Sequence, residues 1–248
     1  MALVNTDAIV LRSYNLAEAD RIVVCLTRSV GLVRAVARGA RRMKSRFGAA
    51  LEPFTLVRLA FYEKENRELV TISTAEILKS QFEMAAQLET AEVLAYISEM
   101  VGAFAPPHEA NERLFRMVVA CVDALQASPK SANAVLRYFE VWLLRLSGLF
   151  PDVRVCAECA SRVAAETAVY LDPEGMIRCE SCNGRSGLRL SPETQRVLIG
   201  IQQLSPLQFV TDFAPIKEPG ESEVAALTQR LVVRALERRP RTMVVSSA

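Results

Sequence analysis

The sequence has 248 residues, of which 51% are hydrophobic and 23% charged, and these values are typical of a folded protein rather than a disordered one. No apolar run of about 18 residues occurs, which argues against a membrane-spanning helix, and an acid at Asp7 with no basic segment before it argues against a signal peptide. We therefore expect a cytoplasmic protein without a membrane partner, whose six cysteines are reduced.

The net charge of +2 is unevenly distributed along the chain. Residues 1–80 contain 13 Lys and Arg against 8 Asp and Glu, whereas the remainder contains 17 against 20. Residues 21–51 contain eight basic residues and no acidic one. A positive N-terminal part on a slightly negative body favours a local site for a polyanion.

Histidine is nearly absent, which lowers the expectation of an enzyme. The single histidine, His108, follows two prolines and is expected in an exposed loop. Histidine is the most frequent general base and a common ligand of catalytic zinc. The phosphate-loop, nucleophile-elbow and HExxH motifs are also missing. We expect no enzymatic activity.

The first part of the chain predicts a small β-barrel. Short runs rich in Val, Ile, Thr and aromatic residues occupy 7–13, 21–27, 32–38, 54–62 and 69–77. Five strands, with the longest connection between the third and the fourth, fit a closed barrel of the OB type. An SH3-like barrel has the same number of strands and remains the alternative.

From about residue 81 the apolar period becomes helical. Helices are predicted around 94–104, 114–125 and 133–146, then from a capping Ser191 to about residue 204, and over 221–238. The predicted fold is α+β: an OB-fold DNA-binding domain over 1–80, helical parts over 81–152 and 188–248, and an inserted cysteine knuckle over 153–187.

Four cysteines carry the strongest motif. Cys156 and Cys159 form one CxxC pair, and Cys179 and Cys182 form a second. A predicted hairpin over 168–178 would bring the pairs together, and four thiolates suit a closed tetrahedral zinc site with a structural role. Two disulfides, an iron–sulfur cluster and a site that has lost its metal are the alternatives. Cys25 and Cys121 lie in apolar patterns and are expected in the core.

A run of cations in the longest connection of the barrel is the candidate DNA site. Arg34 and Arg38 share one strand face, and further cations follow from the end of that strand. Such a cluster can neutralise phosphates, while Tyr14, Phe47 or Tyr62 could stack on unpaired bases. The residues assigned to DNA contact are Arg34, Arg38, Arg41, Arg42, Lys44 and Arg46.

The combined pattern resembles the RecO family of bacterial DNA repair and recombination proteins. The segment RGARRMKSRFGAALEPFTLVRLAFYE lies in the barrel, FEVWLLRLSGLFPDVRVCAECA runs from a helix into the first cysteine pair, and CESC follows. The resemblance covers the chain from Asp7 to about Leu204. Within the basic segment, it matches Arg38, Arg41, Arg42, Lys44 and Arg46. Met43 stands where the family often has proline.

The resemblance implies a recombination mediator. Proteins of this family bind single- and double-stranded DNA, anneal complementary strands and, with RecR and often RecF, help to load RecA onto DNA coated by single-strand binding protein (SSB). Association with the nucleoid follows from such a role. An acidic SSB tail would seek clustered arginines such as Arg234 and Arg238 in the last helix.

The sequence leaves two other function classes open. One is a zinc-containing nucleic-acid enzyme, which would need an open metal position and a carboxylate base. The other is an adaptor of a repair complex, in which the barrel binds protein and makes no DNA contact of its own.

Overall fold

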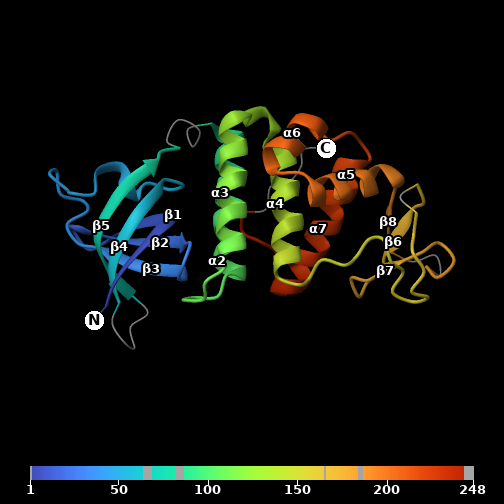
Figure 1. The fold of residues 1–248 in the computed structure, drawn as a ribbon, viewed down its shortest axis with the longest axis horizontal. Coiled ribbons are helices and arrows are strands. Elements are labelled where there is room, and N and C mark those ends of the chain that lie inside the picture. Colours follow the sequence, from blue (N-terminus) through green and yellow to red (C-terminus); the bar gives the residue numbers. More distant parts are fainter. Residues whose placement is uncertain (1, 64–68, 82–86, 165, 184–186, 243–248) are drawn as a thin grey trace. The chain divides into compact units, whose positions relative to one another are not determined.

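The structure is a computed structural model that describes residues 2–63, 69–81, 87–164, 166–183 and 187–242 (Figure 1). Two compact units divide the chain between Val122 and Asp123. The finer four-part domain division stays a prediction. No helix within the described ranges is long and apolar enough to cross a membrane.

The first unit begins with a closed barrel of five strands, β1 (Ala2–Leu16), β2 (Asp20–Thr27), β3 (Gly31–Ala37), β4 (Leu56–Glu63) and β5 (Leu69–Lys79). Strand β1 pairs antiparallel with both β2 and β4, and β3 pairs parallel with β5. The resulting order, β1-β2-β3-β5-β4, is that of an OB fold. The predicted OB barrel is confirmed, and the SH3-like alternative is wrong.

Apolar side chains at alternate positions of the strands fill the interior of the barrel. Inward positions such as Val23, Val33, Leu59 and Ile72 are fully buried, because successive side chains of a strand point to opposite faces. A short 3-10 helix, η1 (Gly48–Leu51), adds Leu51 to this core. Strand β1 begins earlier than residue 7, where the sequence placed it, because residues 2–6 pair with β4.

Helix α2 (Leu88–Phe104) and the larger part of α3 (Glu112–Ala127), which crosses the boundary after Val122, complete the first unit. Arg12 on β1 donates from Nε to Ser98 Oγ and from Nη2 to the Ser98 carbonyl oxygen, both at 2.9 Å, and so ties α2 to the barrel. His108 is exposed in the loop between the two helices, as predicted, and its backbone N–H donates to the Leu32 carbonyl oxygen at 3.1 Å. The loop thereby contacts the start of β3.

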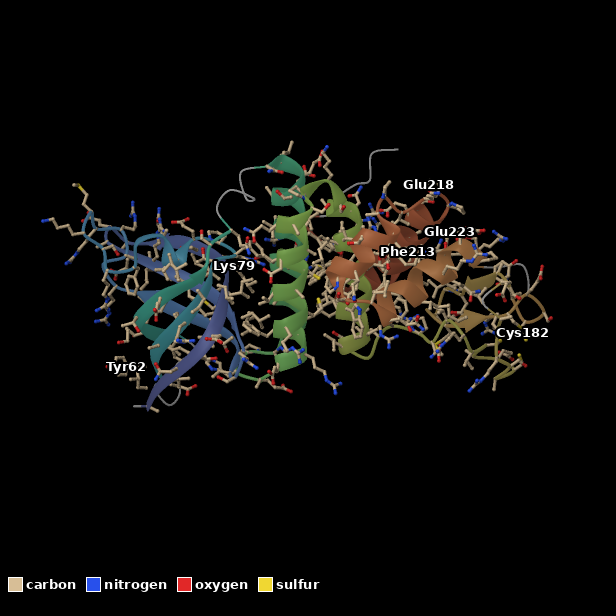
Figure 2. The ribbon with its side chains drawn as sticks, turned by 45° about the horizontal axis from the view of Figure 1, so that its top comes forward. Tyr62, Lys79, Cys182, Phe213, Glu218 and Glu223 are labelled. Carbon is tan, nitrogen blue, oxygen red and sulfur yellow. The ribbon has the colours of Figure 1, made fainter. Side chains whose placement is uncertain are left out.

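The second unit is built on α4 (Ala132–Leu146), which follows η2 (Pro129–Ser131) and contacts α5 (Pro192–Gln203), α6 (Pro206–Phe213) and α7 (Gly220–Leu236). Ser191 caps α5 as predicted, since its Oγ accepts from the Thr194 N–H. Helix α6 was not predicted. It has only 8 residues, too few for a clear helical period, and its Phe213, labelled in Figure 2, stacks on Phe209 with ring centroids 5.1 Å apart.

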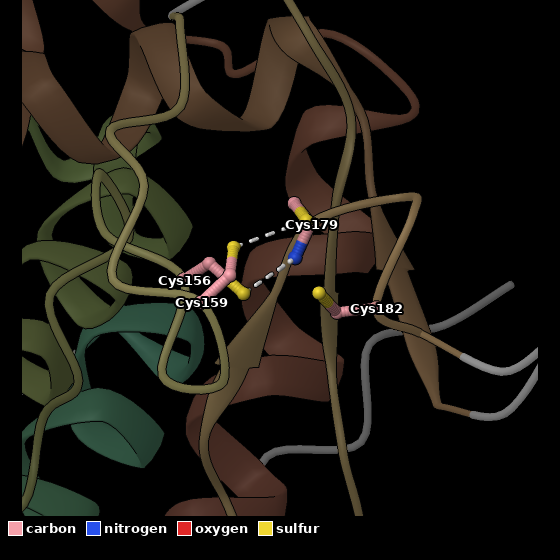
Figure 3. A group of neighbouring side chains, drawn as sticks. All are labelled: Cys156, Cys159, Cys179 and Cys182. Atoms are coloured by element: carbon pink, nitrogen blue, oxygen red, sulfur yellow. Dashed lines mark hydrogen bonds between the residues drawn. The ribbon is translucent and has the colours of Figure 1, made fainter.

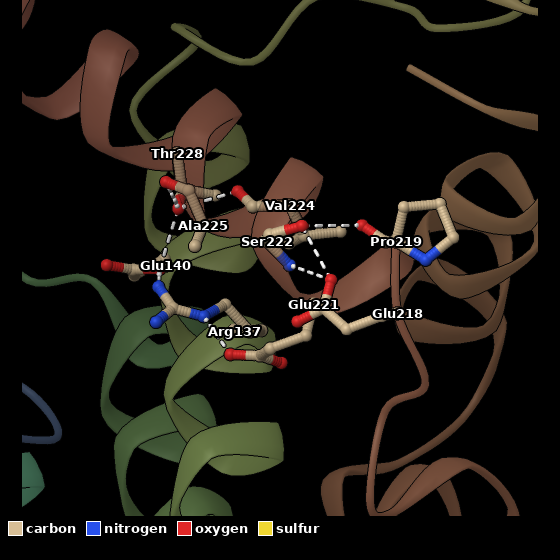
Figure 4. Close-up of polar contacts among 9 residues, drawn as sticks. All are labelled: Arg137, Glu140, Glu218, Pro219, Glu221, Ser222, Val224, Ala225 and Thr228. Carbon is tan, nitrogen blue, oxygen red and sulfur yellow. Dashed lines mark hydrogen bonds and ion pairs between the residues drawn. The ribbon is translucent and has the colours of Figure 1, made fainter. Parts of the chain in front are cut away.

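A buried arginine connects α4 with α7 (Figure 4). Arg137 donates from Nη1 to Glu140 Oε2 at 2.6 Å and from Nε to Glu221 Oε1 at 2.9 Å. Thr228 donates from Oγ1 to Glu140 Oε2 at 2.7 Å. The two carboxylates compensate the desolvation of the guanidinium, and removal of one partner would leave a charge buried without compensation.

The cysteine-rich segment forms a small sheet of β6 (Val169–Leu171), β7 (Ile177–Arg178) and β8 (Leu188–Leu190), with β6 in the centre. The predicted hairpin over 168–178 corresponds to β6 and β7. Strand β8 was not predicted because it has only three residues. The hairpin turn lies against α7, where Arg234 donates from Nη1 to the Pro173 carbonyl oxygen at 3.4 Å.

Substitution of Gly31 should detach the α2–α3 loop from the barrel. Gly31 has a φ of +78°, and a Cβ there would lie 2.0 Å from the Glu109 carbonyl oxygen. We expect Gly31→Ala to lower the free energy of unfolding by about 2 kcal/mol more than Gly48→Ala. Gly48 has a φ of +49° and open space around its Cβ position, so it controls for the backbone conformation. Equal losses in calorimetric unfolding would contradict the close-approach argument.

Candidate nucleic-acid interface and metal centre

The six cations predicted to contact DNA lie on or directly after β3. Arg34 is on the strand, and the others follow its end at Ala37. All six side chains are exposed, namely Arg34, Arg38, Arg41, Arg42, Lys44 and Arg46. The structure therefore brings the predicted residues to one continuous stretch of surface. Their contact with DNA stays a prediction.

The basic loop, residues 38–47, has a defined conformation. Its start is held by Gly39, whose N–H donates to Asp20 Oδ1 at 2.8 Å, and by the Arg41 N–H, which donates to the Ala19 carbonyl oxygen at 3.0 Å. A turn follows in which the Ser45 N–H donates to the Arg42 carbonyl oxygen at 2.9 Å. The cations are thus displayed on an anchored backbone, which reduces the entropy lost when a ligand orders them.

The aromatic residue of the loop serves as its second anchor. Phe47 is 3% exposed and belongs to the barrel core, so its interpretation as a stacking surface was wrong. The guanidinium of Arg46 lies 4.9 Å from the centre of the Phe47 ring. Met43 at the tip is fully exposed. The two other aromatic candidates, Tyr14 and Tyr62, are 40% and 37% exposed on the outside of the barrel.

Other arginines of the barrel are matched by acids. Arg58 Nε lies 3.6 Å from Asp7 Oδ1, and Arg21 Nη1 lies 2.9 Å from Glu52 Oε1. The Coulomb interaction in each pair lowers the positive potential that these side chains contribute. These two pairs therefore lower the positive charge that the barrel carries outside β3 and the basic loop.

The four cysteines of the two CxxC pairs converge in space (Figure 3). Their Sγ atoms all lie within 4.8 Å of one another, and those of Cys159 and Cys179 are 3.9 Å apart. Cys25 and Cys121 are fully buried elsewhere, as predicted, and burial raises the pKa of both thiols.

Backbone turns position the thiols. The Ala157 N–H donates to the Ile177 carbonyl oxygen at 2.7 Å, which joins the first pair to β7. Arg178, at the end of β7, donates to Glu158 between the first two cysteines at 2.7 Å and to the buried Asp172 at 2.8 Å. One guanidinium thus links the first CxxC pair to the hairpin turn that delivers the second.

The cluster stabilises at least one thiolate. Backbone N–H groups of Cys159 and Cys179 lower the pKa of Cys156 to about 6, and the Cys179 N–H donates to Cys156 Sγ at 3.4 Å. Interactions with the neighbouring thiols, Cys179 first, raise the pKa of Cys182 to about 12. Metal ligation requires thiolates, so a metal that binds here must displace the remaining protons.

The geometry of the four sulfurs fits a tetrahedral metal ion. Zinc–sulfur bonds of about 2.3 Å place the four sulfurs about 3.8 Å apart. This spacing is close to that of Cys159 and Cys179, and the whole group lies within 4.8 Å. The four-cysteine cluster can therefore hold a metal ion. Its identity as zinc stays a prediction.

The family models and the relatives that match this chain point to the same family. A family model described as "Recombination protein O N terminal" matches residues 1–81, and one described as "Recombination protein O C terminal" matches residues 85–243. A DNA repair protein RecO of Koribacter versatilis is 30% identical over 236 residues, which cover 95% of this chain and 93% of that protein.

Two other relatives carry the same name. The DNA repair protein RecO of Rubrobacter xylanophilus is 32% identical over 95% of this chain and 91% of its own length. The DNA repair protein RecO of Symbiobacterium thermophilum is 35% identical over 77% of this chain and 76% of its own length.

Metal analysis of the purified chain tests the four-cysteine cluster. We expect about one zinc ion per chain, bound by four sulfurs at about 2.3 Å in X-ray absorption spectra. Cys159→Ser should lose most of the metal, because an alcohol does not ionise to replace the thiolate. Cys121→Ala controls for the loss of a cysteine outside the cluster and should retain the metal. Full zinc occupancy in Cys159→Ser would contradict the assignment.

Proposed function

The chain belongs to the RecO family of DNA repair and recombination proteins, and from this premise we propose that it is a DNA-binding, strand-annealing recombination mediator rather than an enzyme. The observation that carries the proposal is the anchored basic loop, whose exposed cations, from Arg38 on, follow Arg34 on β3. Phosphate groups are the ligands that such a cluster suits best.

Annealing needs no chemical step on this surface. Two single strands repel each other through their phosphates, and cations that contact both backbones screen this repulsion while the bases pair. Contacts to phosphates position a strand without reading its sequence, so binding to single- and double-stranded DNA should show little sequence preference.

The family role extends the proposal to protein partners. We propose that the protein acts with RecR, and with RecF as a further partner, to help load RecA onto DNA coated by SSB in the cytoplasm, in association with the nucleoid. The arginines at the end of α7 offer charge for an acidic SSB tail. Of these, Arg238 is exposed, and Arg234 is exposed and also contacts the Pro173 carbonyl oxygen.

The cysteine cluster supports a structural role for zinc. Four thiolates would complete a tetrahedral coordination sphere, whereas a catalytic zinc keeps one position for water or substrate. In the proposed function the ion fixes the knuckle to β6 and β7, and no step of annealing depends on it.

Charge reversal in the basic loop tests the proposal. We expect Arg41→Glu/Arg42→Glu to weaken single-stranded DNA binding at least tenfold near physiological salt and to slow annealing. The slope of log K against log salt should become shallower by roughly 1.4, because about two phosphate contacts with the single strand are lost. Fluorescence anisotropy over a salt series measures both quantities, and circular dichroism checks the fold.

The matched control is Arg113→Glu/Arg116→Glu, which changes the net charge equally. Both arginines are exposed on α3, outside the barrel. Equal weakening by the two double variants would show a general charge effect and contradict the site. Unchanged DNA affinity in the loop variant would favour the adaptor function instead, if the protein also binds an acidic partner peptide and DNA does not compete with that peptide.

A further inference from the structure

The basic loop, residues 38–47, carries three apolar side chains whose surroundings differ. Phe47 is 3% exposed in the barrel core, and Ala40 is partly buried against the same core. Met43 lies between them in the sequence, and its side chain is fully exposed. Single exposed apolar residues are common on protein surfaces, so a role for Met43 has to follow from its place in the loop.

Two successive turns place Met43 at the tip of the loop. The Arg42 N–H donates to the Gly39 carbonyl oxygen at 3.2 Å, and the Ser45 N–H donates to the Arg42 carbonyl oxygen at 2.9 Å. Met43 and Lys44 are therefore the two central residues of a β-turn. Both side chains are exposed, so the turn presents one apolar and one charged group side by side.

The loop is held on both sides of this tip. Before the tip, Arg41 donates from Nη1 to the Ala17 carbonyl oxygen at 2.8 Å. After the tip, Phe47 is buried in the barrel core. Met43 is thus exposed on an anchored backbone, and such a side chain can enter a ligand without a large loss of backbone entropy.

Cations stand directly before and after Met43. Arg42 and Lys44 are both exposed and suit contacts with phosphates. A ligand that binds both cations brings its phosphates to the two sides of Met43 and its apolar part to the thioether. The minor groove of duplex DNA has this arrangement, because phosphates line both edges of a groove about 6 Å wide and base pairs form its floor.

The side chain of methionine suits insertion rather than stacking. It is unbranched, and its three rotatable bonds and polarizable sulfur let it fill irregular gaps. It has no planar face on which a nucleobase could lie. Apolar wedges, methionine among them, enter between base steps from the minor groove, separate the two base pairs in part and kink the duplex.

We propose that Met43 is an apolar wedge that enters duplex DNA at a weakly stacked base step while Arg42 and Lys44 hold the phosphates on either side. The inference rests on the proposed function and adds to it a preference for mismatched over perfectly paired duplexes. A wedge must separate stacked base pairs, and this separation costs least where the pairing is already defective. Such steps arise wherever two annealed strands are not fully complementary.

Duplex DNA is favoured over an anionic membrane surface as the occupant. Binding to a membrane interface needs an apolar face of several large residues in addition to cations, whereas the tip of this loop offers one such residue. A wedge in DNA needs one side chain for each base step that it opens. The number of apolar groups at the tip therefore matches DNA.

The test compares two duplexes of about 20 base pairs that differ only in one central thymine–thymine mismatch. A fluorescent adenine analogue next to the central position reports unstacking by a rise in its emission. Wild-type protein should bind the mismatched duplex about 3 to 10 times more tightly than the perfect one and should raise the emission.

Two variants separate apolar character from length. Met43→Gln keeps a side chain of similar length but makes it polar, so it should lose both the preference and the rise in emission. Met43→Leu keeps the apolar character and should retain both. Affinity for the perfect duplex should stay within about twofold of wild type in both variants, because the phosphate contacts remain.

The outcomes are distinct for the two proposals. Equal affinity of the wild-type protein for the two duplexes, with a normal salt slope, would overturn the wedge and leave the DNA-binding function intact. A preference retained in Met43→Gln, or equal losses in Met43→Gln and Met43→Leu, would also overturn it. Loss of binding to anionic lipid vesicles in Met43→Gln, with DNA binding unchanged, would identify a membrane as the occupant instead. Failure of the basic-loop reversal to weaken binding of either duplex would count against the proposed function itself.

Discussion

Closure of the barrel by β1 is the constraint on which the first unit depends. This strand pairs with β4 through its first part and with β2 through its last part, and a bulge lies between Val10 and Arg12. A register shift of one residue would exchange inner and outer side chains along the strand. The same pairing therefore fixes the apolar core, the outward position of Tyr14 and the contact of Arg12 with α2.

The basic loop owes its order to this barrel. Asp20 at the start of β2 holds Gly39, and the core holds Phe47, so the cations between them are displayed from two fixed ends. Charge that is held in place attracts phosphates without a large entropic cost of ordering. Acids elsewhere on the barrel, such as Asp7 beside Arg58, lower the positive charge outside the basic loop.

Charged contacts stabilise both the helices and the four-cysteine knuckle of the second unit. Arg137 neutralises Glu140 and Glu221 at the junction of α4 and α7, and Arg178 performs a similar role between Glu158 and Asp172 in the knuckle. Buried or half-buried arginines suit such positions, because the planar guanidinium donates to two carboxylates at once. The hydrogen bonds of Arg178 to Glu158 and Asp172 thus hold the knuckle in place beside its four thiols.

The sequence by itself determined the strands of the barrel, the capped helix at Ser191, both CxxC pairs and the cationic stretch, because each depends on local spacing and residue type. It left open whether Phe47 stacks on bases or anchors the loop, because an exposed and a buried aromatic look the same in a sequence. It missed α6 and β8, because these short elements carry too few residues for a period. The barrel topology, the convergence of the four sulfurs, and the hydrogen bond of Arg34 to Tyr14 were decided only by the tertiary structure. All three depend on strand pairing and register between distant segments, which no local pattern specifies.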